Sequence, residues 1–300
     1  MNSHYLALSP LITLFFFLTI LPPSYSNAVE YFVECSRTFD CGWIKNIPYP
    51  FWGGYRPEYC GSQGFELTCL DNEYPYPIIR IEELEFLVLN ISQSHPIMTI
   101  ARLDLWNSLC PPTLDNTTLD FNYFNYSTPT DQNLTLFYNC TSRVRGLDRA
   151  NFPCPLGGVG ATGNTANYFV DEFSPKIPEL LKECNTSIKV PILRTALIGA
   201  VWEALPLGPL PKVLKQGFDV DYLNALSIPC WVCVASGGIC NSASSSQSFV
   251  CFCRDGEQPR VCSSNGMLAR FSSHFWIRLK HIFLVLCLVL LVYSSHNFIV

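Results

Sequence analysis

The stretch CGWIKNIPYPFWGG, residues 41–54, gathers aromatic rings, prolines and glycines in a segment that fits neither a long helix nor a central strand. Pro48 and Pro50 each lack a backbone N–H group, and each drives the residue before it toward an extended conformation. The segment is therefore predicted to be a stiff, kinked loop. The rings that it carries belong to Trp43, Tyr49, Phe51 and Trp52. They either fill a small core or face a flat ligand such as a sugar.

The composition and the N-terminus indicate an exported protein. Only 14% of the 300 residues are charged, against about 25% in an average soluble protein. Residues 6–21 form an apolar run, and the small residues that follow it offer a cleavage site. Residues 1–26 are therefore predicted to be a signal peptide. The length suggests about two domains.

A second apolar segment, residues 277–300, ends the chain. Its strongly apolar part, residues 282–293, is shorter than the roughly 20 residues that a spanning helix needs. Three interpretations stay open: a weak membrane anchor, a signal for a lipid anchor, or a tail that does not belong to the native protein.

The chain has fifteen cysteines, and all but Cys287 lie between residues 35 and 262. An even number of cysteines in an exported region predicts a disulfide framework rather than zinc or redox chemistry, although the connectivity cannot be deduced. The predicted bridging residues are Cys35, Cys41, Cys60, Cys69, Cys110, Cys140, Cys154, Cys184, Cys230, Cys233, Cys240, Cys251, Cys253 and Cys262. Six precede residue 149 and eight follow it, which predicts modules at 27–148 and 149–266 that each close their own bridges.

Sequons for N-glycosylation also indicate an exported, extracellular protein. They lie at Asn90, Asn116, Asn125, Asn133, Asn139 and Asn185. Asn139 is the weakest acceptor, because its sequon contains Cys140 and a glycan there would compete with disulfide closure.

The periodicity predicts strands within residues 77–91, 96–106 and 133–141, and short helices around residues 174–183 and 210–216. Gly217 is expected to stop the second helix. The predicted fold class is mainly β with short helices, in a disulfide-rich two-module secreted ectodomain.

Several motifs together carry a family resemblance. In the first half they are CGWIKNIPYPFW (41–52), CGSQGFELTC (60–69), ARLDLWNSLCP (101–111) and LFYNC (136–140). In order and spacing they resemble the galacturonan-binding extracellular domain of plant wall-associated receptor kinases. In the second half, ECNTSIKVPIL (183–193), LKQGFDVDY (214–222) and the cysteine-rich run 230–256 resemble the C-terminal module of that family. This second module is the one found in leaf-rust-resistance-type receptor-like kinases.

No catalytic site is expected. The kinase elements V-A-I-K, H-R-D and D-F-G are absent from the 300 residues. GGVGATG (157–163) lacks the strand–turn–helix context of a nucleotide-binding loop. His95 is expected to be a surface loop residue, and no cofactor or metal is predicted. A paired-carboxylate glycosidase stays the least supported possibility.

The resemblance implies sugar binding near the quoted stretch. The predicted ligand-binding residues are Lys45, Tyr49, Phe51, Trp52, Tyr55 and Arg56. Rings can stack on sugar faces and cations can pair with uronate carboxylates. In residues 27–145, fourteen Asp and Glu stand against seven Lys and Arg, an excess of negative charge that opposes a polyanion, unless the cluster Arg143, Arg145 and Arg149 or bridging calcium offsets it.

Two hypotheses follow for function. The first is extracellular binding of cell-wall pectin or galacturonan by a kinase-less receptor-like glycoprotein, secreted or attached to the plasma membrane and facing the cell wall. The alternative is a protein- or peptide-binding ectodomain that acts as co-receptor or decoy. Receptor kinases at the cell surface are possible partners of either, membrane attachment would run through the C-terminal tail, and no nucleic acid is expected.

Overall fold

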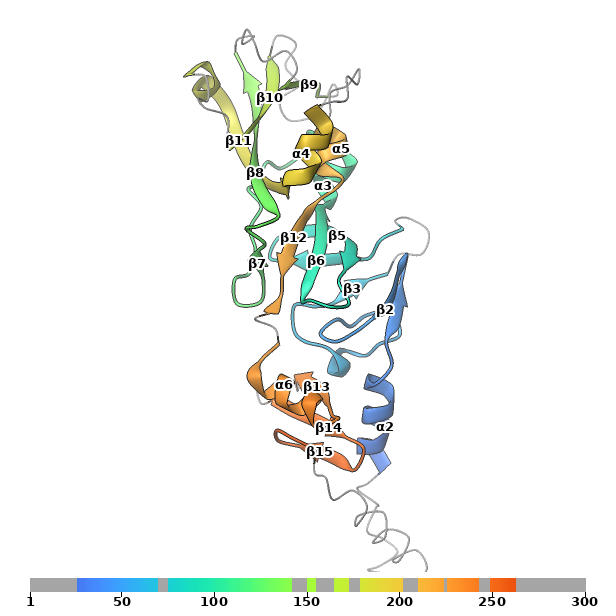
Figure 1. Cartoon of the computed structure of the whole chain (residues 1–300). Helices are drawn as coiled ribbons and strands as arrows, with labels where there is room; N and C mark the ends of the chain where they lie inside the picture. The colour runs from blue at the N-terminus through green and yellow to red at the C-terminus, as the bar shows by residue number, and fades with distance from the viewer. Residues whose placement is uncertain are drawn as a thin grey trace, which may run out of the picture. The chain divides into compact units, whose positions relative to one another are not determined.

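The computed structural model of the chain describes residues 26–69, 75–141, 150–154, 165–172, 179–201, 210–223, 226–242 and 249–262. Strands dominate and helices are short (Figure 1), which confirms the predicted fold class. The described residues fall into two compact units. The larger contains residues 37–231 and 240–249, and the smaller contains residues 26–36, 232–239 and 250–262.

The larger unit begins with a hairpin. Strand β1 (Phe39–Cys41) pairs with β2 (Ile44–Ile47) around a two-residue turn at Gly42 and Trp43. The disulfide between Cys41 and Cys69 ties the hairpin to the strand region that follows. Beyond β2, the predicted kinked loop contains a cis Tyr49–Pro50 bond.

A six-stranded sheet follows, in the order β3-β4-β5-β6-β12-β7. Its strands are β3 (Leu67–Thr68), β4 (Ile78–Ile81), β5 (Leu84–Ile91), β6 (Ile97–Arg102), β7 (Asn125–Tyr126) and β12 (Phe218–Asp221). The predicted strand 77–91 is therefore two strands, because Glu82 takes a left-handed turn conformation with φ 53°. Strand β12 arrives from far along the chain and separates β6 from β7.

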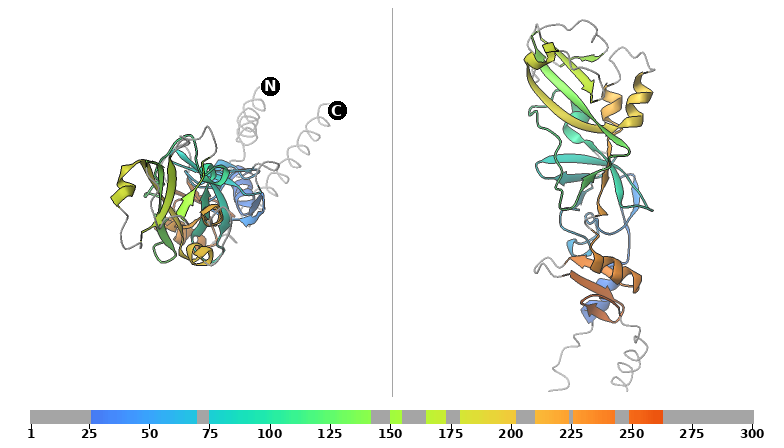
Figure 2. Two further views of the ribbon diagram at one scale, coloured as in Figure 1. Left: turned by 90° about the horizontal axis from the view of Figure 1, so that it is seen from above. Right: turned by 60° about the vertical axis from the view of Figure 1, so that its left-hand side comes forward.

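A four-stranded sheet has the order β11-β8-β10-β9. Its strands are β8 (Asp131–Cys140), β9 (Asn151–Phe152), β10 (Ala166–Asp171) and β11 (Cys184–Leu193). Strands β8, β10 and β11 run side by side (Figure 2), and β10 and β11 are both antiparallel to β8.

Short helices accompany these sheets. They are η1 (Glu58–Cys60), α3 (Leu103–Asn107), η3 (Glu179–Glu183), α4 (Arg194–Val201) and α5 (Leu210–Leu214). The predicted helix near 210–216 is confirmed as α5, and Gly217 follows it with φ 70°. The other predicted helix is described only from Glu179, where it is a 3₁₀ helix.

Two main cores fill the larger unit. One lies on the six-stranded sheet and includes Phe51, Phe65, Phe86 and Phe218. The other gathers residues of β8, β11 and helices α3 and α5, and includes Leu136, Tyr138, Ile192 and Leu210. A smaller cluster includes Tyr168 on β10 and Leu181 on η3.

All fourteen predicted cysteines are disulfide-bonded. The expectation that each half closes its own bridges is wrong, because Cys110 pairs with Cys154 and Cys140 with Cys184. The reason is the sheet itself: β8 and β11 pair with Cys140 directly opposite Cys184. The boundary at residue 149 lies outside the described residues and stays a prediction.

The smaller unit contains α2 (Ser26–Cys35), β15 (Gly256–Gln258), and parts of α6 (Ile228–Ala235), β13 (Ile239–Ser242) and β14 (Phe249–Cys253). Strands β13, β14 and β15 form a three-stranded sheet. Helix α2 packs through Tyr31, whose ring stacks on Phe252 with centroids 5.6 Å apart.

Within the described ranges, no helix combines the length and the apolar character needed to cross a bilayer. The predicted signal peptide, apart from Ser26, and the apolar tail 277–300 lie outside those ranges.

Candidate ligand-binding surfaces

The hairpin tip presents Trp43 to solvent. Its side chain is 69% exposed, which is unusual for so large a ring. The tip is held rigidly, because the Trp43 N–H donates to the Pro75 carbonyl at 2.7 Å and the Cys41–Cys69 bridge lies beside it. Gly42 permits this approach: its φ is 56°, and a Cβ atom there would lie 2.5 Å from the Pro75 oxygen.

Trp43 begins a row of side chains on the larger unit, which we call the aromatic row: Trp43, Tyr76, Trp106 and the cation Lys215. The Trp43 and Tyr76 rings meet edge to face with centroids 5.3 Å apart, and the Tyr76 and Trp106 rings with centroids 6.1 Å apart. The Lys215 Nζ atom lies 5.0 Å from the centre of the Trp106 ring. The row thus combines apolar ring surface with a positive charge.

Four of the six residues predicted to bind ligand are buried or half-buried. Phe51 is 0% exposed and packs edge to face against Phe65 and Tyr222, so its ring belongs to the core. Burial raises the pKa of the half-buried Tyr49.

Arg56 and Trp52 hold the loop that carries them. The buried Arg56 guanidinium donates to the carbonyls of Cys60 and Arg37. The half-buried Trp52 indole N–H donates to the Ser62 carbonyl at 3.0 Å, and a Cβ atom at Gly61 would collide with its ring. Both side chains are therefore engaged in fixing the loop.

The other two predicted residues are exposed. Tyr55 is 99% exposed at the turn that follows the kinked loop. Lys45 lies on β2, and its amine is 3.5 Å from the Asp40 carboxylate in an exposed ion pair. The structure therefore does not bring the six predicted residues together on one surface.

A separate polar pocket of about 470 Å³ lies on the larger unit. Its walls come from the segment before β7, from β7 and the following turn, from the start of β8, from the end of β10, and from β11 into α4. Its polar lining includes Asn116, Tyr126, Gln132, Glu172, Lys189 and Arg194. Amides, charges of both signs and one ring suit a ligand rich in hydroxyl groups.

Asp131 lines this pocket and joins the two sheets. Its Oδ1 atom accepts the backbone N–H of Asp219 on β12 at 3.0 Å, while its Oδ2 atom is buried without a hydrogen-bond partner among the described residues. Burial raises the pKa of Asp131 to about 7, and the nearby Asp219 charge contributes in the same direction. The Arg194 Nε atom donates to the main-chain carbonyl of Asp131 at 2.9 Å.

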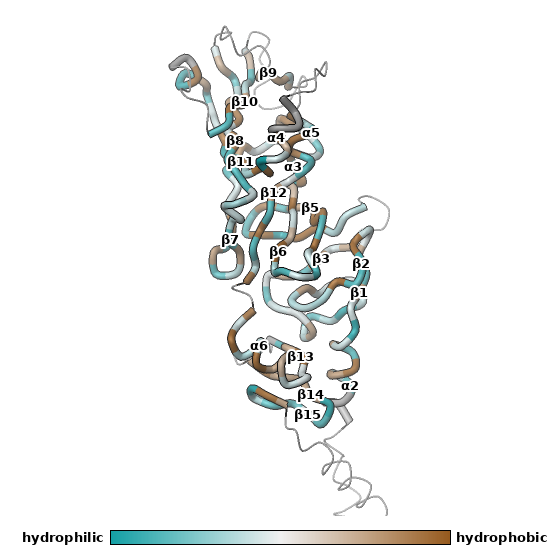
Figure 3. Tube along the Cα trace, viewed as in Figure 1, coloured by the Kyte–Doolittle hydropathy of each residue, from teal (hydrophilic) through white to brown (hydrophobic). Residues whose placement is uncertain are grey.

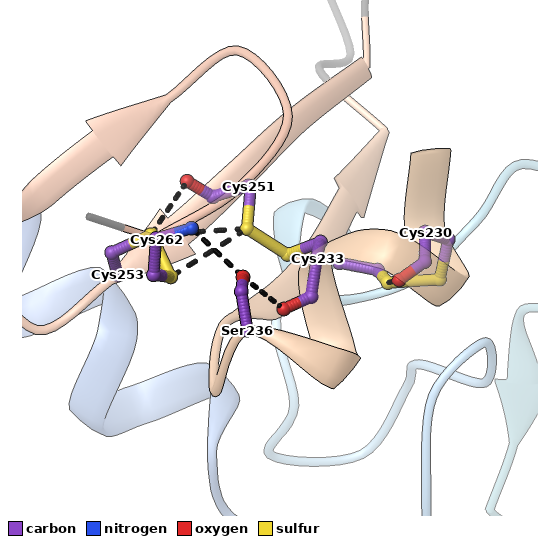
Figure 4. The surroundings of a disulfide bond; sticks show 7 residues. Cys230, Cys233, Ser236, Cys251, Cys253 and Cys262 are labelled. Carbon is purple, nitrogen blue, oxygen red and sulfur yellow. Dashed lines mark hydrogen bonds between the residues drawn. A yellow bond between two sulfur atoms is a disulfide. The ribbon is translucent and has the colours of Figure 1, made fainter. Parts of the chain in front are cut away.

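The cysteine-rich end holds a cluster of sulfur atoms, shown in Figure 4. The Cys251 sulfur lies 3.8 Å from those of Cys253 and Cys262, a spacing that three thiolates around a metal could also adopt. The bonding is different: Cys233 pairs with Cys251, and Cys253 pairs with Cys262. Bridged sulfurs are not thiolate ligands, so this cluster is structural.

Other predicted features divide between described and undescribed residues. His95 is an exposed loop residue, as expected, and its Nδ1 atom is 2.8 Å from the Ser94 hydroxyl. The glycine-rich stretch 157–163 and the cluster Arg143, Arg145 and Arg149 lie outside the described residues.

Sequence reasoning missed most of the aromatic row. Trp43 belonged to the quoted stretch, but Tyr76, Trp106 and Lys215 are distant from it in sequence. The sequence offered one signal, which was the position of two of these rings. Tyr76 directly precedes the predicted strand 77–91, and Trp106 lies within the motif ARLDLWNSLCP.

Two family models match the chain. The wall-associated receptor kinase galacturonan-binding family matches residues 35–102. The wall-associated receptor kinase C-terminal family matches residues 156–256. No solved structure matches significantly.

Curated relatives from Arabidopsis thaliana are similar over most of the chain. Leaf rust 10 disease-resistance locus receptor-like protein kinase-like 2.1 is 28% identical over 85% of this chain and 39% of its own length. Leaf rust 10 disease-resistance locus receptor-like protein kinase-like 1.4 is 32% identical over 69% of this chain and 28% of its own length. The kinase-like 2.8 protein of the same group is 31% identical over 82% of this chain and 25% of its own length. The chain thus spans less than two fifths of each, and both matched modules belong to the ectodomain part.

Proposed function

We propose that this chain, which belongs to the wall-associated receptor-like proteins of the leaf-rust-resistance kinase type and matches their ectodomain, binds acidic cell-wall polysaccharide of the galacturonan class. Binding would occur outside the cell or at its surface, without chemistry. The observation that carries the proposal is the aromatic row, which starts inside the 35–102 match.

The row offers what a uronate chain requires. The apolar face of a pyranose ring can stack on the exposed Trp43 indole, and the rigid hairpin reduces the entropy lost on binding. A uronate carboxylate can pair with Lys215, which lies over the Trp106 ring. Lys215 thereby supplies a local positive charge on a chain whose net charge is −5.

Binding of the glycosylated chain to de-esterified and methyl-esterified galacturonan fragments tests the proposal. We expect tighter, salt-sensitive binding to the de-esterified form, because methylation removes the carboxylate charge. Trp43→Ala should weaken binding about five- to tenfold, since one aromatic contact contributes on the order of 1 kcal/mol. Lys215→Gln should weaken only the de-esterified interaction, by a few-fold.

Matched variants make the result specific. Trp231→Ala removes another exposed indole, on α6, and Lys212→Gln removes another exposed lysine, on α5; neither should change polysaccharide binding. Tyr55→Ala compares the two candidate sites, because Tyr55 belongs to the six residues predicted from the sequence to bind ligand and not to the aromatic row. If the folded chain binds neither fragment, or if Trp43→Ala binds as the wild type does, the proposed site is wrong.

A protein or peptide ligand is the second candidate, and α6 is the feature that favours it. This helix is apolar along most of its length (Figure 3) and exposes Ile228, Trp231 and Val234. Exposed apolar groups gathered on one element are typical of protein interfaces. Trp231→Ala separates the candidates, because it should weaken a protein partner's binding and leave the polysaccharide's unchanged.

A further inference from the structure

The polar pocket has an asparagine of a glycosylation sequon in its wall. Asn116, Thr117 and Thr118 form the sequon, and Asn116 and Thr117 both line the pocket. The Asn116 and Thr118 side chains are exposed. A glycan attached to Asn116 would therefore reach the pocket from the surface, without having to enter the core.

The folded chain holds the Asn116 amide in one orientation. Its Oδ1 atom accepts the backbone N–H of Lys189 on β11 at 2.8 Å, and the Thr117 N–H donates to the Lys189 carbonyl at 3.0 Å. The Tyr126 hydroxyl donates to the Thr117 carbonyl at 3.0 Å. These bonds engage the Asn116 oxygen. Among the described residues, no hydrogen bond is formed by its Nδ2 atom, to which a glycan attaches.

A second sequon asparagine lines the same pocket but is oriented differently. The Asn133 Nδ2 atom donates to the Glu172 carboxylate at 3.1 Å. Its amide nitrogen is therefore engaged within the protein. Asn116 is the better placed of the two to direct a sugar along the pocket wall.

We propose that Asn116 carries an N-glycan whose innermost sugar residue lies in the polar pocket and stabilises the larger unit. In the modification, the Asn116 Nδ2 atom bonds to the anomeric carbon of a lipid diphosphate-linked oligosaccharide. The amide loses one hydrogen as a proton, and the lipid diphosphate leaves.

The pocket's chemistry fits that occupant. An N-acetylated sugar carries hydroxyl and amide groups, which the Gln132 amide, the Glu172 carboxylate and the Lys189 amine can bind. The Tyr126 ring offers a stacking face. The volume of about 470 Å³ lies within the range of small-ligand sites.

The first test separates the glycan from the side chain that bears it. Thr118→Ala destroys the sequon but keeps Asn116 and its hydrogen bond to Lys189, whereas Thr118→Ser keeps both. Because a bound group stabilises the folded state, Thr118→Ala should lower the unfolding midpoint by about 2–4 °C. Thr118→Ser should not, and neither should Ser187→Ala, which removes the sequon of the exposed Asn185.

Peptide mapping of the full chain by mass spectrometry measures occupancy. An unmodified Asn116 in the wild type would overturn the proposal. So would a fall in the Thr118→Ala midpoint no larger than that of Ser187→Ala, because the glycan would then project into solvent.

A second measurement uses the wild type alone, so it tests the proposal even if the Thr118→Ala variant does not fold. An amidase that cleaves the glycan–asparagine bond should release the Asn116 glycan at least about tenfold more slowly than the Asn185 glycan from the native chain, because the pocket shields the bond. After denaturation the two rates should be equal. Equal rates in the native chain would also overturn the proposal.

Discussion

Arg102 shows how one buried charge organises its surroundings. Its side chain lies in the motif ARLDLWNSLCP and donates through Nε and Nη2 to both Asp104 carboxylate oxygens, at 3.0 and 2.6 Å. Its Nη1 atom donates to the Asp115 carbonyl, next to the sequon of Asn116. The motif that carries the family resemblance thus contains a structural ion pair that also positions the 115–117 segment.

Asp104→Ala should lower the free energy of unfolding by about 3 kcal/mol, because it leaves the buried Arg102 guanidinium without its counter-charge. Denaturant unfolding measures the loss. Glu83→Ala is the control, since it breaks the exposed Arg80–Glu83 pair and should cost less than about 1 kcal/mol. Equal losses in the two variants would show that Arg102 does not need its partner.

Asp131 should make stability depend on pH. Its pKa of about 7 in the folded chain exceeds the usual value near 3.9, so the folded state retains a proton that the unfolded state releases. The contribution to stability is complete below about pH 4 and is lost as the pH rises to about 7. The loss is on the order of 4 kcal/mol.

Asp131→Asn should remove most of that fall, because the amide oxygen can still accept the Asp219 N–H and the group carries no charge. Unfolding free energies at about pH 4, 6 and 8 measure it. Asp115→Ala, at an exposed side chain, should leave the pH profile of the wild type unchanged. A wild-type stability that rises across this range would contradict the assignment.

At the scale of elements, the turn between α6 and β13 depends on a close approach to the disulfide cluster. A Cβ atom at Gly238 would lie 2.4 Å from the Cys251 sulfur and 2.7 Å from those of Cys233 and Cys262. Ser236 secures the same turn, because its hydroxyl accepts the Cys262 N–H at 2.8 Å and donates to the Cys233 carbonyl at 2.7 Å. Sulfur packing therefore holds this turn in place.

In the Gly238→Ala variant, the Cys233–Cys251 and Cys253–Cys262 disulfides should both form incompletely, because the added methyl group occupies the space of the sulfur atoms. Counting free thiols in the secreted chain measures this. Gly237→Ala is the comparison: its Cβ would meet nothing within 4 Å, so its cost comes from backbone strain alone and its bridges should close. A fully oxidised Gly238→Ala chain would refute the prediction.

The larger unit, as a whole, draws its sheets from both halves of the sequence. Strand β12 pairs with β6, and β11 pairs with β8. A chain truncated after residue 148 would therefore expose the edges of β6 and β8 and leave Cys110 and Cys140 without partners.

Such a truncated chain, residues 27–148, should be secreted poorly and should carry free thiols. Thiol counting and circular dichroism check this against the chain that continues to residue 266. A folded, fully oxidised 27–148 fragment would instead support the boundary that the number of cysteines predicts.

Local features of this molecule could be predicted from sequence, and most long-range ones could not. The strand β8, the helix α5 and the disulfide framework follow from alternation, a glycine stop and the even number of cysteines. Pairing across the predicted boundary has no local signal, because fourteen cysteines give no connectivity. The sequence also does not show which aromatic side chains are buried. Phe51 and Trp43 belong to the same stretch, residues 41–54, but Phe51 lies in the core and Trp43 is exposed to solvent.

The position of β12 also governs when the chain can fold. The six-stranded sheet cannot be completed until residues 218–221 have emerged from the ribosome, because they separate β6 from β7. Contacts between such distant segments slow folding and prolong the exposure of unpaired strands. The β4–β6 strands must therefore wait, partly assembled, through the synthesis of a long stretch of chain, so assistance during export should matter more for this protein than its length suggests.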